Sequence, residues 1–323
     1  MDRIQFGAFY SRGCGIGPGE FAKKAEDLGF DGFFASETPT NRGPSDDTFT
    51  TLAYAAAATT RITVAPDVLL LPLHHPHWVA KQFGTLDRFS NGRAFLAVGA
   101  AGEYAKQFEA LGMPVSERGK RTNEGIDIIR KFWTEDEVSY HGDIFNFDGI
   151  QMEPRPPARP GRPHPPIWVG GRPGGTEVGP DGNLRKKSAT GAIKRAAERG
   201  DGWDPYYMTP DMYRDSVEQI RDHAASIGRD LTNYEWALTT FWLMRPSYDE
   251  ALEAAKKKLR YGRDMSERIE KYDILGNPDD IEKRLQSFID AGVRYFICNW
   301  SCEPDEVLQH IEWIAKEVMP RFK

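Results

Sequence analysis

Short apolar runs alternate with longer amphipathic stretches along this chain. The short runs are rich in β-branched and aromatic residues, as strands are, and each is followed by a stretch with helical periodicity. Strands are predicted at eight places: 4–9, 32–36, 62–65, 94–98, 167–169, 202–203, 235–243 and 294–298. Because strands that alternate with helices build parallel sheets, the pattern predicts successive β/α units.

The helical stretches have recognisable ends. Helices are predicted over 47–59, 77–89, 121–133, 278–289 and 305–318. Gly29, Gly200 and Gly292 each separate the end of a helix from the next strand, at a left-handed position that glycine adopts readily. Eight such units in 323 residues predict the α/β class and a (β/α)8 TIM barrel with insertions. An open doubly wound sheet is the alternative.

Two segments interrupt the alternation. Region 104–166, between the fourth and fifth strands, contains a helix, a hairpin signal around 141–143 and a stretch, 154–166, with seven prolines. We expect it to be an insertion within a single domain that spans 1–323, with the proline-rich part extended. Region 172–187, after the fifth strand, is rich in glycine and charge. It is predicted to be a mobile loop at the barrel mouth and a candidate lid.

Composition limits the classes of function. The 42 basic and 48 acidic side chains give a net charge of −6, which excludes an obvious nucleic-acid footprint. Hydrophobic residues make up 40% of the chain, enough for a large core, but no run approaches the roughly 20 apolar residues that cross a membrane. Three cysteines, an odd number, and the lack of a visible signal peptide predict reduced thiols and a cytoplasmic protein.

In a TIM barrel the chemistry lies where the strands end, so the residues that follow the strands are the candidate site. They are Tyr10, Glu37, Thr38, Asp67, Val68, 99–103, Gly170, Gly171, 203–207, Asn299 and Trp300. This set is aromatic and rich in glycine with few acids, which favours a flat ring system over a divalent metal. Glu37 and Glu103 are candidate acids or bases, and each could equally be a solvated or paired structural acid.

Two further motifs leave alternatives open. His74, His75 and His77 suggest metal ligands, but no spacing of the H-E-x-x-H kind accompanies them. A loop that leads into the next helix, with one or two of the histidines lining the pocket, explains them better. Gly170 and Gly171, with the helix start at 188–192, could bind a phosphate through free backbone donors or could simply be part of a helix cap.

Ten blocks, in this order, resemble the bacterial luciferase-like monooxygenase family. They are RITVAPDVLLLPLHHP at 61–76, AKQ at 80–82, TLDRFSNGR at 85–93, AVGA at 97–100, FEALG at 108–112, ERG at 117–119, FWTE at 132–135, PPIWVGG at 165–171, RAAERGDGW at 195–203 and GNP at 276–278. The similarity covers nearly the whole chain, and the joint order of the blocks is more specific than any single one.

The resemblance implies a barrel that binds reduced flavin mononucleotide (FMN) or the deazaflavin coenzyme F420, with the ring across the strand ends. It implies a non-prolyl cis peptide behind the ring, matched here by Asp67–Val68. The other residues that it places around the cofactor are Gly99, Gly170, Gly171, Ser188, Thr190, Gly191 and Ala192, with Trp203 and Trp300 as apolar walls. Many F420-dependent members resemble one another in an Asp-His pair after the second strand, where this chain has Ser36, Glu37 and Thr38, so no imidazole is expected there.

The leading hypothesis is a monooxygenase that uses reduced FMN and O2 on a small organic substrate, with Glu37, Thr38, His75 and Glu103 as the polar groups near the ring. F420-dependent hydride transfer is the alternative. A metal-assisted TIM-barrel hydrolase and a non-catalytic flavin-binding protein are the alternatives from other classes. We expect a homodimer and a separate flavin reductase, and we expect no metal, nucleic acid or membrane partner.

Overall fold

Eight parallel strands form the core of the protein. The structure is a computed structural model that describes residues 3–38, 45–101, 104–178, 184–187, 190–258, 260 and 264–322. The strands follow one another around the sheet in the order β3–β2–β1–β14–β12–β11–β8–β5. Their bounds are β1 (Gln5–Phe9), β2 (Gly32–Ala35), β3 (Thr63–Pro66), β5 (Leu96–Gly99), β8 (Ile167–Gly170), β11 (Gly202–Asp204), β12 (Glu235–Met244) and β14 (Tyr295–Trp300). Each of the eight lies where the sequence predicts a strand.

The two ends of this sheet meet. Val64 of β3 forms a parallel bridge with Ala94, just before β5. The N–H of Val64 donates to the carbonyl of Arg93 at 2.9 Å, and the N–H of Phe95 donates to the carbonyl of Val64 at 3.3 Å. The sheet is therefore a nearly closed barrel, which confirms the predicted (β/α)8 class and rules out the open doubly wound sheet. Two short strands that the sequence did not predict, β4 (Leu69–Leu70) and β13 (Ile274–Gly276), extend along β5 and β12.

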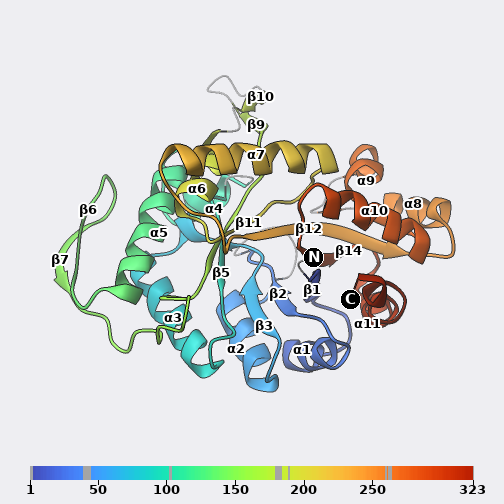
Figure 1. Ribbon diagram of the computed structural model, residues 1–323, viewed down its shortest axis with the longest axis horizontal. Coiled ribbons are helices and arrows are strands. Elements are labelled where there is room, and N and C mark those ends of the chain that lie inside the picture. The colour runs from blue at the N-terminus through green and yellow to red at the C-terminus, as the bar shows by residue number, and fades with distance from the viewer. Residues whose placement is uncertain are drawn as a thin grey trace.

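Helices surround the barrel (Figure 1). They are α1 (Pro18–Asp27), α2 (Thr48–Ala58), α3 (Pro76–Phe89), α4 (Lys106–Ala110), α5 (Arg118–Thr134), α6 (Thr190–Arg199), α7 (Pro210–Ser226), α8 (Tyr248–Lys257), α9 (Ser266–Tyr272), α10 (Pro278–Asp290) and α11 (Val307–Trp313). Short helical turns are η1 (Leu71–Leu73), η2 (Val115–Glu117), η3 (Pro304–Glu306), η4 (Ile314–Val318) and η5 (Met319–Phe322). Their first turns follow from the sequence: the side chain of Asn277 accepts from two N–H groups of α10, and Pro278 fills a position that needs no donor.

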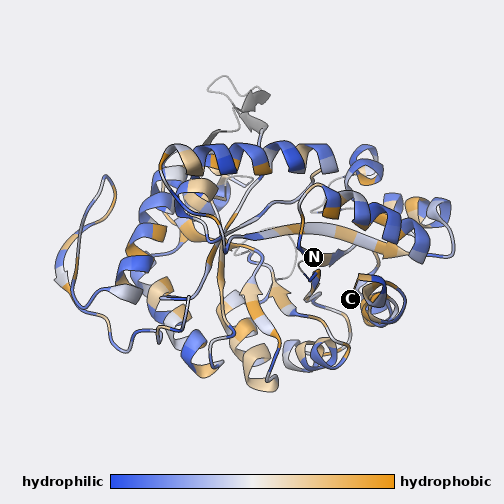
Figure 2. Cartoon of the chain, viewed as in Figure 1, coloured by the Kyte–Doolittle hydropathy of each residue, from blue (hydrophilic) through white to orange (hydrophobic). Residues whose placement is uncertain are grey.

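The core has two layers. Inward-facing strand residues form a closed cluster inside the barrel: Phe9, Phe34, Ala65, Phe95, Ala97, Trp168, Ala237, Tyr295 and Ile297. Alternate residues of the same strands, such as Phe6 and Phe33, belong to a larger cluster that includes the inner faces of the helices. Figure 2 shows the same division, because apolar colour follows the strands while helices such as α7 are hydrophilic over much of their surface.

The predicted insertion contains α4, α5 and a two-stranded antiparallel hairpin of β6 (Val138–His141) and β7 (Asn146–Ile150). Arg159 and Arg162 hold the proline-rich return against the barrel. The guanidinium of Arg159 pairs with buried Asp87 at 2.7 Å, and Arg162 donates to the carbonyls of Gly92 and Ala94. Region 172–187 differs from the expectation of an irregular loop, because it contains the antiparallel strands β9 (Gly175–Val178) and β10 (Leu184–Lys187). In the part of the chain that the structure describes, no helix combines the length and apolar character needed to cross a membrane.

Candidate functional site at the barrel mouth

Val68 lies between the ends of two barrel strands. A cis peptide bond joins it to Asp67 after β3, at the position that the resemblance implies. A Cβ atom placed on Gly99 would lie 2.5 Å from Cγ2 of Val68, and one placed on Gly170 would lie 3.0 Å from Cγ1. Val68 therefore occupies the space that glycine leaves at the ends of β5 and β8, where it packs on the inner cluster. The arrangement gives the mouth an apolar platform of the kind that a flat ring requires.

The start of α6 lies beside the end of β8. A Cβ atom on Gly171, whose φ is +120°, would lie 3.3 Å from the Cβ of Ala192, and Gly191 is exposed with open space around it. The N–H groups in the first turn of a helix have no partner within the helix and favour an anion. The structure thus brings Gly171, Gly191 and Ala192 together, and Thr190 begins the helix. Ser188 lies outside the described residues.

Glu37 contacts a histidine that the sequence did not predict to be its partner. Its Oε1 lies 2.5 Å from Nε2 of His74, and its Oε2 accepts the backbone N–H of Leu70. The ring of His74 packs edge-on against Phe49 of α2, with ring centroids 5.9 Å apart. The segment after β2 itself has no histidine, as the sequence shows, but the fold supplies one from elsewhere, because β4 and η1 carry His74 back to the end of β2. The sequence signal was the paired histidines at 74–75, but only the fold shows which one reaches Glu37.

The other two histidines of this run have separate contacts. The side chain of His75 accepts from the N–H of His77 at 3.3 Å and so caps α3, and its ring packs against Phe145 of the insertion. Burial, together with the charge of His77, lowers the pKa of His75, so its ring is neutral near neutral pH. His77 packs against Phe132, with centroids 4.8 Å apart. Among the described residues no three His, Cys, Asp or Glu side chains form a group that could hold a metal ion.

Trp203 and Trp300 do not form walls of the mouth. Trp203 is fully buried, packs on Tyr213 of α7 and donates its indole N–H to the carbonyl of Gly171 at 2.9 Å. Trp300 is also buried and donates its indole N–H to the carbonyl of Phe9 at 2.7 Å. The prediction of ring contacts for both is corrected, because both side chains belong to the outer layer of the core. Their bonds instead fix the backbone at the ends of β8 and β1.

A buried pair of acids lies next to the platform. Oγ1 of Thr239, on β12, is 2.8 Å from Oδ2 of Asp67 and 3.0 Å from Oδ1 of Asp204, the last residue of β11. Burial raises the pKa of Asp67 to about 6. Burial and the charge of Asp67 together raise the pKa of Asp204 well above its ordinary value. The sequence analysis included Asp204 only within the strand-end stretch 203–207, without a role, and did not include Thr239, because a single acid or threonine within a strand carries no spacing signal.

Two predicted polar residues have no assigned contact. Thr38 is partly exposed after β2. Glu103 lies outside the described residues. These features nevertheless fit a flat-ring cofactor that carries a phosphate. The platform offers an apolar face to the ring, the exposed helix start offers N–H groups to the phosphate, and the acid pair offers polar groups beside the ring. The geometry therefore defines a parallel β/α barrel whose candidate site residues lie at the carboxyl ends of its strands.

Comparisons with known proteins place the chain in a family. Residues 19–177 match the model of the family described as luciferase-like monooxygenase. The chain is 27% identical to the 5,10-methylenetetrahydromethanopterin reductase of Archaeoglobus fulgidus over 94% of this chain and 95% of that protein. It is 36% identical to the FMNH(2)-dependent dimethylsulfone monooxygenase of Pseudomonas putida over 36% of this chain and 31% of that protein. The chain belongs to the luciferase-like monooxygenase family, which confirms the resemblance drawn from the sequence.

Solved structures agree on the fold. An F420-dependent secondary alcohol dehydrogenase, solved with an F420–acetone adduct, superposes with a TM-score of 0.78. The alignment covers 99% of both chains at 20% identity. At that identity the match supports the barrel alone.

Proposed function

We propose that this chain is an oxidoreductase that binds reduced FMN or F420 at the barrel mouth and acts on a small organic molecule. The observation that carries the proposal is the position of Val68 on Gly99 and Gly170, beside the first turn of α6. This arrangement offers an apolar face to a ring and free N–H groups to a phosphate. When bound, the cofactor supplies the redox chemistry, and the protein supplies orientation and exclusion of water.

Of the two reactions we favour F420-dependent hydride transfer. It is supported by the reductase of A. fulgidus, which matches nearly the full length of this chain. Oxygenation with reduced FMN and O2 is the second candidate, and the name of the P. putida relative supports it. A separate flavin reductase would be needed only for this second reaction.

The Glu37–His74 pair is proposed to position the mouth rather than to exchange protons with the substrate. Both carboxylate oxygens of Glu37 already have partners, and its side chain is only 9% exposed. The contacts of Glu37 join the end of β2 to β4 and to the turn after it, and β4 follows Val68 directly. A fixed Glu37 therefore helps to keep the platform in place.

The deciding experiment is an anaerobic spectral titration of the purified protein with reduced F420 and, separately, with reduced FMN, followed by admission of air. Selective binding of F420 without oxygen consumption supports hydride transfer. Selective binding of FMN with oxygen consumption supports the second candidate. Binding of neither cofactor would contradict the proposal.

Two parts of the cofactor site are proposed from sequence position. Thr190→Glu at the start of α6 should weaken cofactor binding and leave the melting temperature of the free protein nearly unchanged, because it brings a negative charge to the proposed phosphate site. Equal affinity in the variant would contradict the phosphate assignment.

Region 172–187 is proposed as a lid, and cofactor should protect it from proteolysis. Unchanged cleavage would contradict the lid.

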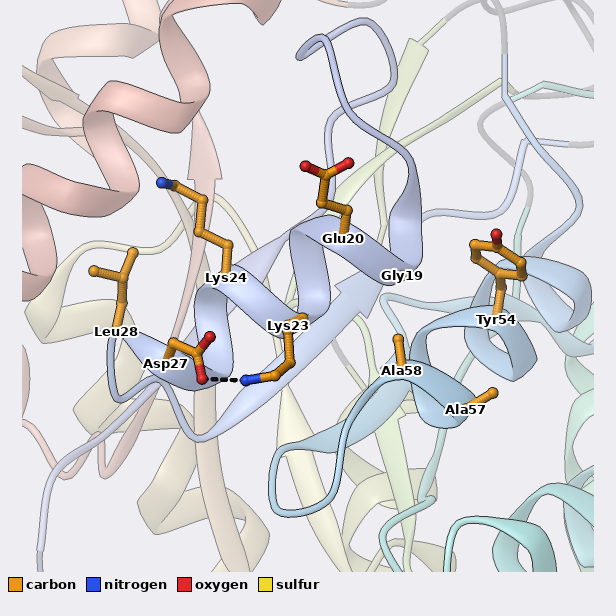
Figure 3. A pocket seen from close by; sticks show the side chains of 9 residues that line it. All are labelled: Gly19, Glu20, Lys23, Lys24, Asp27, Leu28, Tyr54, Ala57 and Ala58. Carbon is orange, nitrogen blue, oxygen red and sulfur yellow. Dashed lines mark hydrogen bonds and ion pairs between the residues drawn. The ribbon is translucent and has the colours of Figure 1, made fainter.

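A homodimer is proposed from the outer face of α2 and α3. Figure 3 shows a hollow between α1 and α2, lined on one side by Gly19, Lys23 and Leu28 and on the other by Tyr54 and Ala58. Tyr54 is 64% exposed, and Ala53, Ala57 and Ala58 of α2 are exposed as well. Exposed apolar patches of this kind favour a partner surface.

Light scattering tests the dimer. Trp78 and Phe89, at the two ends of α3, are also largely exposed. Tyr54→Glu is expected to shift the mass from dimer to monomer, because it introduces a charge into that surface. Ile227→Glu, next to α7, is the matched control and should leave the mass unchanged.

A cytoplasmic location is also proposed, supported by three buried cysteines without disulfides.

A further inference from the structure

Asp67 and Asp204 compete for one hydroxyl group. A threonine hydroxyl has a single hydrogen to donate, yet Oγ1 of Thr239 lies 2.8 Å from one carboxylate oxygen and 3.0 Å from the other. Both distances are those of hydrogen bonds, so one of them must run in the opposite direction, from a protonated carboxyl group to the threonine oxygen. Hydrogen-bond counting alone therefore places one proton on this pair of acids.

No cation compensates the pair. In the described residues neither Asp67 nor Asp204 forms an ion pair with lysine, arginine or histidine. Asp204 in turn contributes to the raised pKa of Tyr213, whose hydroxyl donates to the carbonyl of Ala237 at 3.0 Å. Asp204 is 2% exposed, and its Oδ2 has no hydrogen-bond partner among the described residues. A second negative charge at this place would be uncompensated, which also favours one retained proton.

The two acids lie at different depths, with Asp204 nearer the interior of the barrel and Asp67 nearer its mouth. Asp204 is the inner member, at the end of β11 and in register with Gly170 of β8. Asp67 is the outer member, because it is partly exposed and its peptide bond leads directly to Val68 on the platform. Thr239 lies between them on β12. With the proton on Asp204, the bonds run from Asp204 to Thr239 and from Thr239 to Asp67, which leaves the negative charge on the group at the mouth.

We propose that Asp67 is the proton-exchanging group of the mouth and that Asp204 and Thr239 position it and hold its charge. In one direction Asp67 takes a proton from an O–H or N–H group of the bound molecule. The bond to hydrogen breaks, its electron pair stays on the substrate atom, and a new O–H bond forms on Asp67. In the other direction Asp67 returns the proton. The role in turnover rests on the proposed function, whereas the shared proton can be measured without any cofactor.

The pH dependence follows from the environment of the pair. Burial raises the pKa of Asp67 to about 6, while the hydrogen bond from Thr239 works in the opposite direction. A base with such a pKa is ionised at neutral pH and can still return its proton, as general acid–base catalysis requires. Thr239→Val should raise the pKa of Asp67 further because the variant loses that bond. Thr239→Ser should restore it.

Infrared spectroscopy of the cofactor-free protein at neutral pH is the first test. The carbonyl band of a protonated carboxyl group is expected in the wild type and in Asp67→Asn, and its loss is expected in Asp204→Asn. Thr240→Val is the matched control, because Thr240 is the next residue on β12 and its hydroxyl bonds to the carbonyl of Tyr272 instead. An identical band in the wild type and Asp204→Asn would overturn the shared proton.

The pH profile of turnover is the second test. Asp67→Asn should lower the rate of turnover about 100-fold. It should also remove the acidic limb of the pH profile, which is the fall in rate toward low pH as Asp67 becomes protonated. Thr239→Val should move that limb to higher pH, Thr239→Ser should return it, and Thr240→Val should leave it in place. A full rate with an unchanged limb in Asp67→Asn would overturn the role of Asp67. If the wild type binds neither cofactor, the proposed function fails while the infrared result still decides whether the proton is shared.

Discussion

Replacing Asp204 by asparagine should stabilise the protein relative to the wild type, and this advantage should grow as the pH rises. The expectation holds although the substitution changes a buried polar side chain of the barrel. The amide has nearly the same shape as a protonated carboxyl group, and its N–H can donate to Thr239 as the acid does. The variant therefore keeps the hydrogen bond and loses only the ability to ionise. Most substitutions of buried residues destabilise a protein, which makes this direction a sharp prediction.

The magnitude follows from proton linkage. The pKa of Asp204 is raised well above 3.8 by burial and by the charge of Asp67, so the folded state keeps a proton that the unfolded chain releases above about pH 4. The unfolded state then binds fewer protons, and the free energy of unfolding falls by about 1.4 kcal/mol for each pH unit while folded Asp204 stays protonated. Asp204→Asn is free of this loss. Its stability relative to the wild type should therefore rise above about pH 4, by about 1.4 kcal/mol for each pH unit over which folded Asp204 stays protonated.

Urea denaturation at a series of pH values measures this difference. Asp67 titrates in both proteins, so its own contribution, which is present below about pH 4 and lost as the pH rises through about 6, largely cancels. Asp222→Asn, an exposed acid on α7, is the matched control and should give a difference that does not change with pH. A pH-independent difference for Asp204→Asn, or one that falls as the pH rises, would refute the argument.

Three further predictions concern other parts of the structure. Glu26→Gln should lower the free energy of unfolding by about 2 kcal/mol, measured by urea denaturation, because the carboxylate of Glu26 accepts the three N–H groups of 60–62 that lead into β3. Gly99→Ala should lower stability by about 1–3 kcal/mol and weaken cofactor binding in a spectral titration, since the platform has no room for the methyl group, while Gly119→Ala should do neither. His74→Phe should lower the melting temperature but leave the acidic limb of the pH profile unchanged, and a shifted limb would contradict the positioning role.

The strands and the family could be predicted because they depend on local pattern. All eight barrel strands lie at short apolar runs of the sequence, and glycine at 29, 200 and 292 marks three transitions from a helix to the next strand. The cis peptide at Asp67–Val68 also lies where the sequence blocks imply it. Region 172–187 was predicted less well, because glycine and charge favour a loop while the pairing of β9 with β10 rests on backbone hydrogen bonds that composition does not specify.

The sequence by itself determined the order of elements, the barrel class and the family of this protein, because hydrophobic periodicity and short motifs are properties of neighbouring residues. Only the tertiary structure decided which side chains share the mouth. Trp203 and Trp300 follow the strand pattern that predicts a wall, yet they face the outer layer, and His74 rather than His75 reaches Glu37. Asp67 and Thr239 are far apart in the chain and meet only because closure of the barrel brings β3 and β12 to the same inner space, where burial raises the pKa of Asp67.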